Sequence, residues 1–248
     1  MKMLHLHVAL RAWTGMARGS TFSFLLLSGG VGRRTELSYP KQFHLINGHP
    51  MLAYAIIAAI QVDEIDEIIV NCPPGFEEQT ENILEAYAAS KDHMIVPTGA
   101  TRQESTRILV ENARNDHVIL HEAARPVISP DKIVSLIRTE RPNVSYCQPI
   151  HFSMCSVDPQ SHKLLARVDR DTTMNIQLPQ KFARTHLAKA HEEARRRRLI
   201  YTEDAMLCAE VGGFDVFFEP GWNTNIKITT GDDFRFAESV LQGYRIDE

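Results

Sequence analysis

The 248-residue chain lacks any run of about 20 apolar residues, the length that a helix needs to cross a bilayer. It has only four cysteines, which stand far apart at Cys72, Cys147, Cys155 and Cys208. This spacing argues against a disulfide framework and against the paired cysteines of a zinc site. We therefore expect no membrane partner and a reducing, cytoplasmic setting.

An excess of charge of either sign is also missing. The formal net charge is −4, and charged residues make up 23% of the chain, which is ordinary for a globular protein. The basic run Arg195–Arg198 has no aromatic residues among its cations, and it suits the end of a helix that carries Glu192 and Glu193 one turn earlier. The sequence thus predicts no nucleic-acid partner, and any basic site has to be local.

Residues 1–21 differ from the rest of the chain. Their apolar residues are interrupted by His5 and His7, whereas a signal peptide needs a cleaner apolar centre. We expect this segment to be a leader that is disordered or not native, with a natural start at Met16. The remaining residues, 22–248, are expected to form one domain.

Apolar runs that are typical of strands alternate with segments that have helical spacing. Strands are expected at residues 22–27, 65–71, 117–121, 144–149 and 214–218. Helices are expected at residues 50–62, 77–89, 102–113, 130–140 and 185–197, then after Thr202 and from about Gly231. This alternation predicts an α/β fold: a Rossmann-like, mostly parallel sheet with helices on both faces.

The pattern changes between residues 151 and 173. Apolar and polar residues alternate there on both sides of Asp158-Pro159-Gln160, a sequence that is typical of a turn. We therefore expect a β-hairpin arm inserted into the α/β body.

Three glycines and three cations follow the first expected strand, in the segment SGGVGRRTELSYPKQF (residues 28–43). Glycine lets backbone N–H groups approach an anion without a Cβ in the way. The spacing fits neither the dinucleotide fingerprint nor the P-loop. Because neighbouring cations repel one another unless a polyanion neutralises them, the segment predicts a site for a triphosphate with a diphosphate leaving group.

Six motifs in a fixed order resemble the family of 2-C-methyl-D-erythritol 4-phosphate cytidylyltransferases and its relatives, the ribitol 5-phosphate cytidylyltransferases. They are SGGVGRR…PKQF, TGATRQES, HEAARP, LPQKF, TEDA and NIKITTGDD, and they extend from about residue 23 to residue 237. The resemblance implies a nucleotidyltransferase domain in which a polyol phosphate attacks the α-phosphorus of CTP, with Mg²⁺ present. It also implies a homodimer in which each β-arm adds residues to the partner's active site.

The resemblance also implies roles for single residues. The expected catalytic cations are Arg34, Lys41 and Lys227. The expected nucleotide-binding residues are Ser28, Gly29, Gly30, Gly32, Gly99, Arg102, Ser105, Glu122 and Ala123. Glu122 is the expected Mg²⁺ ligand, with an ion pair to Arg125 as the structural alternative. Ser153 and Arg170 of the arm are expected to bind the polyol phosphate, although an exposed hairpin commonly carries solvated charge.

Several positions depart from the family's pattern. The family has an aspartate where this chain has Glu122, and another at the cytosine pocket where this chain has Ala100. HFSMC (residues 151–155) replaces an arm motif that usually reads Arg-Asp-Thr, and Leu178 stands where a threonine is common. These departures leave open whether CTP is strictly required and which polyol phosphate is used, with 2-C-methyl-D-erythritol 4-phosphate favoured over ribitol 5-phosphate.

Two other classes of protein remain open. A nucleotide-sugar glycosyltransferase also has an α/β nucleotide-binding body, and residues 169–171 (DRD) match its Asp-x-Asp metal motif. This match lies in the expected arm rather than at the end of a core strand, and such an enzyme needs no cations around a leaving pyrophosphate. A non-catalytic relative would bind nucleotide without turnover, and Ala100 and Glu122 keep that alternative open.

Overall fold

The computed structural model describes residues 21–30 and 37–243. Gly32 and Arg34 of the expected phosphate site lie outside these ranges, and so do residues 1–20 of the expected leader.

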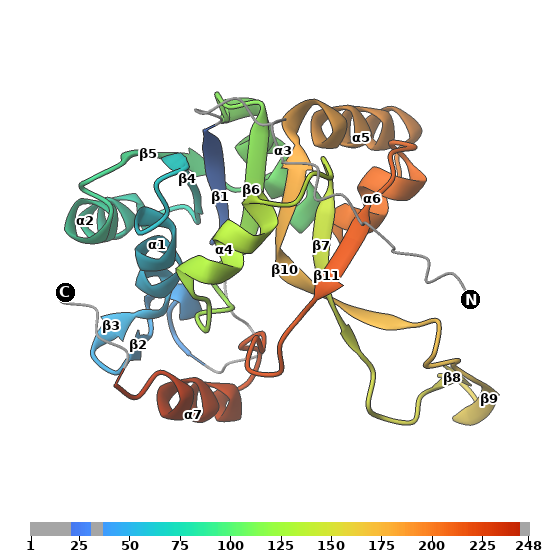
Figure 1. Ribbon diagram of the computed structural model, residues 1–248. Helices are drawn as coiled ribbons and strands as arrows, with labels where there is room; N and C mark the ends of the chain where they lie inside the picture. Colours follow the sequence, from blue (N-terminus) through green and yellow to red (C-terminus); the bar gives the residue numbers. More distant parts are fainter. Residues whose placement is uncertain (1–20, 31–36, 244–248) are drawn as a thin grey trace, which may run out of the picture.

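A seven-stranded sheet lies at the centre of the molecule, in the order β11-β7-β10-β6-β1-β4-β5 (Figure 1). Its strands are β1 Phe22–Leu27, β4 Ile65–Cys72, β5 Asp92–Pro97, β6 His117–Glu122, β7 Val144–Pro149, β10 Met174–Ala183 and β11 Phe217–Pro220. Neighbouring strands are parallel, except that β10 runs antiparallel to both β6 and β7. The mostly parallel α/β sheet that the sequence predicts is therefore confirmed.

Helices cover both faces of the sheet. One face packs against α1 Met51–Ile60, α2 Glu77–Tyr87 and α4 Pro130–Ile137, and the other against α3 Arg102–Asn112, α5 Arg184–Arg197 and α6 Asp204–Glu210. Side chains of β1 alternate between the two cores, with Phe24 and Leu26 in the first and Leu25 in the second. Because both faces are buried, β1 is a nearly continuous apolar run instead of an alternating one.

A third, smaller core lies beneath the last helix. There α7 Gly231–Val240 packs against the short hairpin of β2 Leu45–Ile46 and β3 His49–Pro50, with Ile46 and Phe234 buried between them. Among the helices that the structure describes, none is long and apolar enough to span a membrane.

Within the central sheet, the structure differs from the predicted elements in three strands. The strand expected at residues 214–218 begins later, at Phe217, and Phe214 stacks on the ring of His186, with ring centroids 3.9 Å apart. Two further strands of this sheet, β5 and β10, have no counterpart among the expected strands, and neither do the short strands β2 and β3 outside it.

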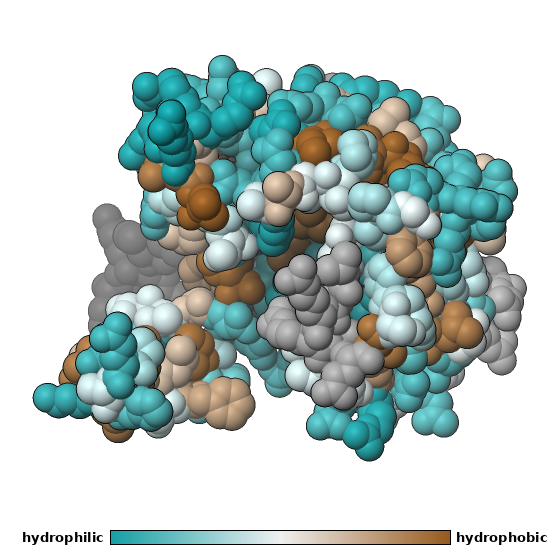
Figure 2. Space-filling model, turned by 180° about the vertical axis from the view of Figure 1, so that it is seen from behind, coloured by the Kyte–Doolittle hydropathy of each residue, from teal (hydrophilic) through white to brown (hydrophobic). Residues whose placement is uncertain are grey.

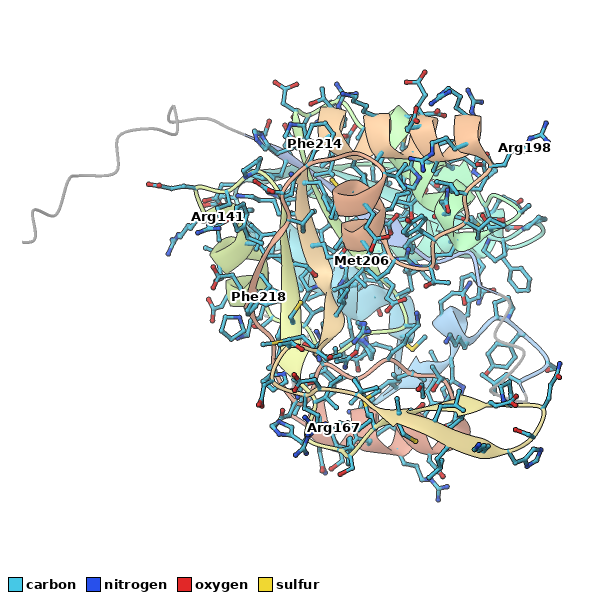
Figure 3. The ribbon with its side chains drawn as sticks, turned by 90° about the vertical axis from the view of Figure 1, so that its right-hand side faces the viewer. Arg141, Arg167, Arg198, Met206, Phe214 and Phe218 are labelled. Carbon is cyan, nitrogen blue, oxygen red and sulfur yellow. The ribbon has the colours of Figure 1, made fainter. Side chains whose placement is uncertain are left out.

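A two-stranded arm extends from the body between β7 and β10 (Figures 1 and 3). It pairs β8 Cys155–Asp158 with β9 Lys163–Arg167 in antiparallel fashion, so the hairpin expected between residues 151 and 173 is present. Apolar and polar side chains are mixed on its surface (Figure 2). Leu164 and Leu165 are 70% and 60% exposed, which is unusual for leucines in a strand.

Candidate active site

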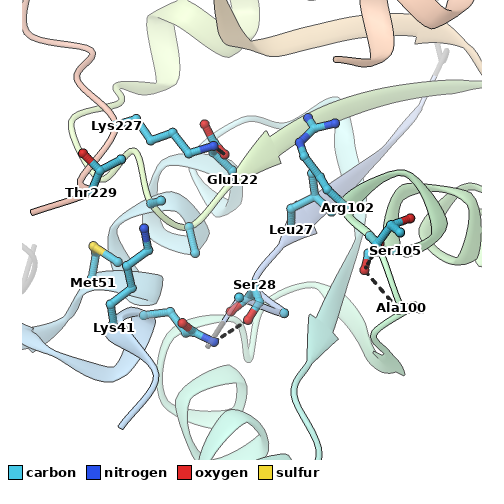
Figure 4. Close-up of a pocket in the computed structure, with 17 residues that line it drawn as sticks. Leu27, Ser28, Lys41, Met51, Ala100, Arg102, Ser105, Glu122, Lys227 and Thr229 are labelled. Atoms are coloured by element: carbon cyan, nitrogen blue, oxygen red, sulfur yellow. Dashed lines mark hydrogen bonds and ion pairs between the residues drawn. The ribbon is translucent and has the colours of Figure 1, made fainter. Parts of the chain in front are cut away.

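A cavity of about 410 Å³ opens at the carboxyl ends of β1 and β6 (Figure 4). From β1 the chain runs outward through β4 and β5 and then returns to β6 on the other side of β1. The carboxyl ends of β1 and β6 are therefore a topological switch point, where parallel α/β sheets bind their ligands. The cavity walls come from residues 27–30, 99–102 and 122–124, joined by single residues such as Lys41 and Lys227.

Two glycines form the wall on the side of α3. A Cβ on Gly29 would overlap Thr98 Cγ2, and a Cβ on Gly99 would overlap the side chain of Glu104. Both positions therefore require glycine, which brings bare backbone to the cavity. Ser105 fixes this wall, because its Oγ accepts a hydrogen bond from Gly99 N and donates one to the Thr101 carbonyl, both at 3.0 Å.

Lys41 and Lys227 lie on the opposite wall (Figure 4). Lys41 stands on the short 3₁₀ helix Lys41–Phe43 and donates from Nζ to the Ile228 carbonyl at 2.5 Å. The helix is tied to the end of β1 by a hydrogen bond from the Gln42 side chain to the Ser28 carbonyl. Residues 28, 41 and 228 are far apart in sequence, and these contacts hold both lysines beside one cavity.

Glu122 ends β6 and is the only carboxylate among the described residues that line the cavity. Its Oε2 accepts from Lys227 Nζ at 2.5 Å, and its Oε1 accepts from Arg125 Nε at 2.7 Å. Burial alone would raise the pKa of Glu122, but Lys227 and Arg125 outweigh burial and lower this pKa to about 2. The carboxylate is therefore ionised at neutral pH.

The histidine that precedes Glu122 lies inside the protein. His121 is fully buried, its Nε2 lies 3.0 Å from the Arg125 carbonyl, and burial lowers its pKa to about 4. No group of three or more His, Cys, Asp or Glu side chains in residues 21–30 and 37–243 is placed to hold a metal ion.

The cavity brings together ten of the fourteen expected site residues: Ser28, Gly29, Gly30, Lys41, Gly99, Arg102, Ser105, Glu122, Ala123 and Lys227. Gly32 and Arg34 lie outside the described residues. Ser153 and Arg170 are exposed on the arm and do not line this cavity. The DRD segment 169–171 is likewise on the arm, so it places no metal motif at the end of a core strand.

The sequence interpretation misses several residues of the cavity wall. Thr101 and Thr229 belong to motifs that the resemblance uses, but neither is predicted to line the site. Gln42 also lines it and belongs to the PKQF motif, whereas Met51 lines it and no pattern in the sequence marks it. Thr101 has one local signal, since its side chain accepts from Glu104 N and caps α3.

Comparison with known proteins agrees with this geometry. The model of the IspD family, described as 2-C-methyl-D-erythritol 4-phosphate cytidylyltransferase, matches residues 23–243. A protein of that name from Syntrophus aciditrophicus is 33% identical over 223 residues, which are 87% of this chain and 93% of that protein. The crystal structure of 4-diphosphocytidyl-2C-methyl-D-erythritol synthase from Anaerococcus prevotii matches with a TM-score of 0.79 at 26% identity, covering 91% of this chain and 97% of that one.

A second solved structure gives the same result. The 2-C-methyl-D-erythritol 4-phosphate cytidylyltransferase from Thermus thermophilus has a TM-score of 0.73 at 26% identity, covering 90% of this chain and 99% of that one. The family model covers nearly the whole chain, and the relatives are matched over nearly their whole length. The chain therefore belongs to the family of 2-C-methyl-D-erythritol 4-phosphate cytidylyltransferases, which are nucleotidyltransferases.

Proposed function

We propose that this protein transfers CMP from CTP to 2-C-methyl-D-erythritol 4-phosphate and releases pyrophosphate. The observation that carries the proposal is the cavity at the switch point, where bare glycine backbone, two lysines and one ionised carboxylate face the same space. These are the groups that a triphosphate and a charged transition state require.

The proposed reaction requires little covalent chemistry from the side chains of the protein. A phosphate oxygen of the polyol phosphate attacks the α-phosphorus of CTP in line, a new P–O bond forms, and the bond to the pyrophosphate oxygen breaks. Because the nucleophile is already ionised, no general base is needed. Lys41 and Lys227 would hold the phosphates in place and stabilise the charge that develops on the oxygens around the reacting phosphorus.

The cavity fits a hard divalent cation such as Mg²⁺. Mg²⁺ is usually held by one or two carboxylates together with substrate phosphates, and it keeps several waters. Glu122 would supply the carboxylate, and the triphosphate would supply the rest. When bound, the ion would neutralise charge on the phosphate oxygens. Since both oxygens of Glu122 are paired with cations, Lys227 has to release Oε2 or share it with the ion.

Glu122→Gln is expected to weaken divalent-ion binding at least about 10-fold, because the amide keeps the shape of the side chain but not its charge. The measurement is a titration of the CTP complex with Mn²⁺, followed by electron paramagnetic resonance. Glu104→Gln is the matched control, since Glu104 is also paired with an arginine, Arg107, but does not line the cavity. Unchanged Mn²⁺ affinity in Glu122→Gln would remove Glu122 as the ligand.

The proposed function is tested by pyrophosphate release. CTP, UTP, GTP and ATP are each mixed with 2-C-methyl-D-erythritol 4-phosphate and with ribitol 5-phosphate, in the presence of Mg²⁺. We expect the fastest release with CTP and 2-C-methyl-D-erythritol 4-phosphate. CTP binding with no release for any polyol phosphate would instead identify a non-catalytic relative.

We also propose a homodimer formed through the arm. Phe152 and Leu164 are 79% and 70% exposed, and exposed apolar side chains gathered on one projection mark an interaction site. Ser153 and Arg170 lie on the same arm, away from the cavity of their own chain. In the proposed dimer they would reach the partner's cavity and bind the phosphate of the polyol.

Leu164→Asp is expected to weaken dimerisation at least about 30-fold, because a charge would replace an apolar side chain in the proposed interface. Sedimentation velocity over a range of concentrations measures this change. Ile200→Asp is the matched control, since Ile200 is 79% exposed but lies on the body. Equal association of both variants and the wild type would contradict the arm-mediated dimer.

A further inference from the structure

The acidic pair of the TEDA motif lies behind the cavity, where the proposed reaction gives it no role. Asp204 begins α6 and is 1% exposed, and Glu203 precedes it as the N-terminal cap of the helix. A buried carboxylate needs a charged partner to remain in the fold. The residue that pairs with Asp204 therefore indicates the role of this motif.

Asp204 contacts the cavity through Arg102. Its Oδ2 accepts from Arg102 Nη1 at 2.5 Å, and the Thr106 hydroxyl lies 3.3 Å from the same oxygen. Its Oδ1 lies 3.2 Å from His191 Nε2 on α5. Asp204 thus stands at the start of α6 between residues of α3 and α5, where few alternative positions are open to its carboxylate.

Glu203 fixes the start of α6 to the central sheet. One of its carboxylate oxygens accepts from Ala205 N at 2.7 Å, and the other accepts from the Gln180 side chain at 2.6 Å. Gln180 lies on β10 and also donates to Ser145 Oγ on β7 at 3.0 Å. These hydrogen bonds therefore fix the position of Asp204 relative to the sheet whose strand ends form the cavity.

Charge keeps the Arg102–Asp204 pair together. Burial raises the pKa of Asp204, but Arg102 and His191 outweigh burial, so this pKa is lowered and the carboxylate is ionised. Burial would lower the pKa of Arg102, but Asp204 and Glu122 outweigh burial and raise it. The Arg102 side chain is nevertheless 26% exposed and lines the cavity between Ser105 and Glu122 (Figure 4). One of its nitrogens is used by Asp204, and the guanidinium has further N–H groups to offer a ligand.

We propose that Asp204 is a positioning residue that holds the Arg102 guanidinium at the cavity wall, so that its remaining N–H groups bind a phosphate oxygen of a substrate. This inference rests on the proposed function, because it names a further contact for the same reaction. The phosphate oxygen belongs either to the nucleotide or to the polyol phosphate, which share this chemistry. Without Asp204, an arginine side chain with four rotatable bonds would lose its fixed orientation, and a displacement of about 1 Å is costly for catalysis.

The test is a double-mutant cycle of Arg102→Ala, Asp204→Asn and the two together. Asp204→Asn alone is expected to lower kcat/KM at least about 10-fold. In the Arg102→Ala background the same substitution is expected to cause no further loss, because Asp204 then has nothing to position. The substrate whose KM rises in the single variants, CTP or the polyol phosphate, identifies the phosphate that Arg102 binds.

A second substitution covers the case in which Asp204→Asn does not fold. Asp204→Glu retains the charge but displaces the carboxylate by one methylene group. It is expected to lower kcat/KM at least about 3-fold in the wild type, and not at all in the Arg102→Ala background. Glu111→Gln is the control for a carboxylate on α3 that pairs with Arg107 away from the cavity, and it is expected to retain full activity.

Losses that multiply in the double variants, in step with a fall in melting temperature, would show that Asp204 only stabilises the fold and would overturn the proposal. Full activity of the single Asp204 variants would overturn it as well. A wild-type protein that releases no pyrophosphate would instead overturn the proposed function, so the two failures are distinguishable.

Discussion

Lys227→Ala is expected to lower kcat at least about 100-fold while the protein remains folded. Removing a cation that stabilises charge on the reacting phosphates costs about 2–4 kcal/mol of transition-state stabilisation. Among the described residues, Lys227 Nζ is the closest cation to Glu122, at 2.5 Å, and its side chain is 37% exposed and lines the cavity. The fold is expected to survive, because Arg125 still pairs with Glu122, and the backbone of Ile228 remains bonded to the Ala124 carbonyl.

Steady-state kinetics with saturating CTP and polyol phosphate measure this effect, and the melting temperature reports on the fold. Lys41→Ala is expected to give a similar loss, since Lys41 faces the same cavity from the 3₁₀ helix. Lys189→Ala is the matched control. Lys189 lies on α5, where its ammonium is over the ring of Phe214, and it does not line the cavity. Near-normal turnover in either active-site variant would exclude that lysine from the mechanism.

Much of the sheet could be predicted because its strands are apolar on both faces. The run Phe22–Leu27 shows this best: its alternate residues enter two cores, and the glycines that follow mark the end of the strand. The strand β5 Asp92–Pro97 has no such signal, since it lies at the edge of the sheet and several of its side chains are exposed. Local pattern therefore identifies the strands that are apolar on both faces and does not reveal the partly exposed edge strand β5.

The strand β10 Met174–Ala183 was missed for a different reason. It lies inside the sheet, yet it buries Gln177, Gln180 and Lys181 and contains Pro179, a residue that argues against a central strand. The pairing with β7 is irregular between Gln177 and Gln180, which accommodates the proline. The Gln180 side-chain amide donates to Glu203 and the Lys181 ammonium to the Thr139 carbonyl. Both partners are distant in sequence, so no local pattern could reveal them.

The residues of the site also fall into those that the sequence predicts and those that it does not. The glycines and lysines of the cavity were expected from motifs, because each motif lies directly after a strand or before a helix. The Arg102–Asp204 contact joins residues 102 positions apart, and the TEDA motif gave no indication of its partner. The arm shows the remaining limit: the sequence predicts the hairpin, but the role proposed for Ser153 and Arg170 depends on the proposed dimer.

The second large effect is expected on the stability of the fold, and it depends on the buried side chain of Lys181. It is 1% exposed in the middle of the sheet, and its Nζ donates to the carbonyls of Thr139 at 2.7 Å and Ile137 at 3.5 Å, just after and at the end of α4. No ion pair to Lys181 occurs within the described part of the chain. Burial lowers the pKa of Lys181 to about 8 from the ordinary value of 10.5. The folded protein therefore releases this proton at a lower pH than the unfolded chain.

The sign of the pH dependence follows from this difference. Below pH 8 both states hold the proton, so the cost of the buried charge is constant. Between pH 8 and 10.5 the unfolded state binds more protons than the folded state, so the free energy of unfolding rises with pH. Between pH 7 and pH 10, the free energy of unfolding of the wild type is expected to rise by about 2 kcal/mol relative to that of Lys181→Met.

Urea unfolding of both proteins at several pH values from 7 to 10 measures this gain. Comparing the two proteins cancels the titration of the other lysines, the tyrosines and the cysteines, which are common to both. Lys189→Met is the control, since Lys189 is not buried in the sheet, and its difference from the wild type is expected to stay constant. A constant difference for Lys181→Met as well would mean that the buried ammonium keeps its proton throughout, and that the carbonyls at the end of α4 offset the loss of its hydration.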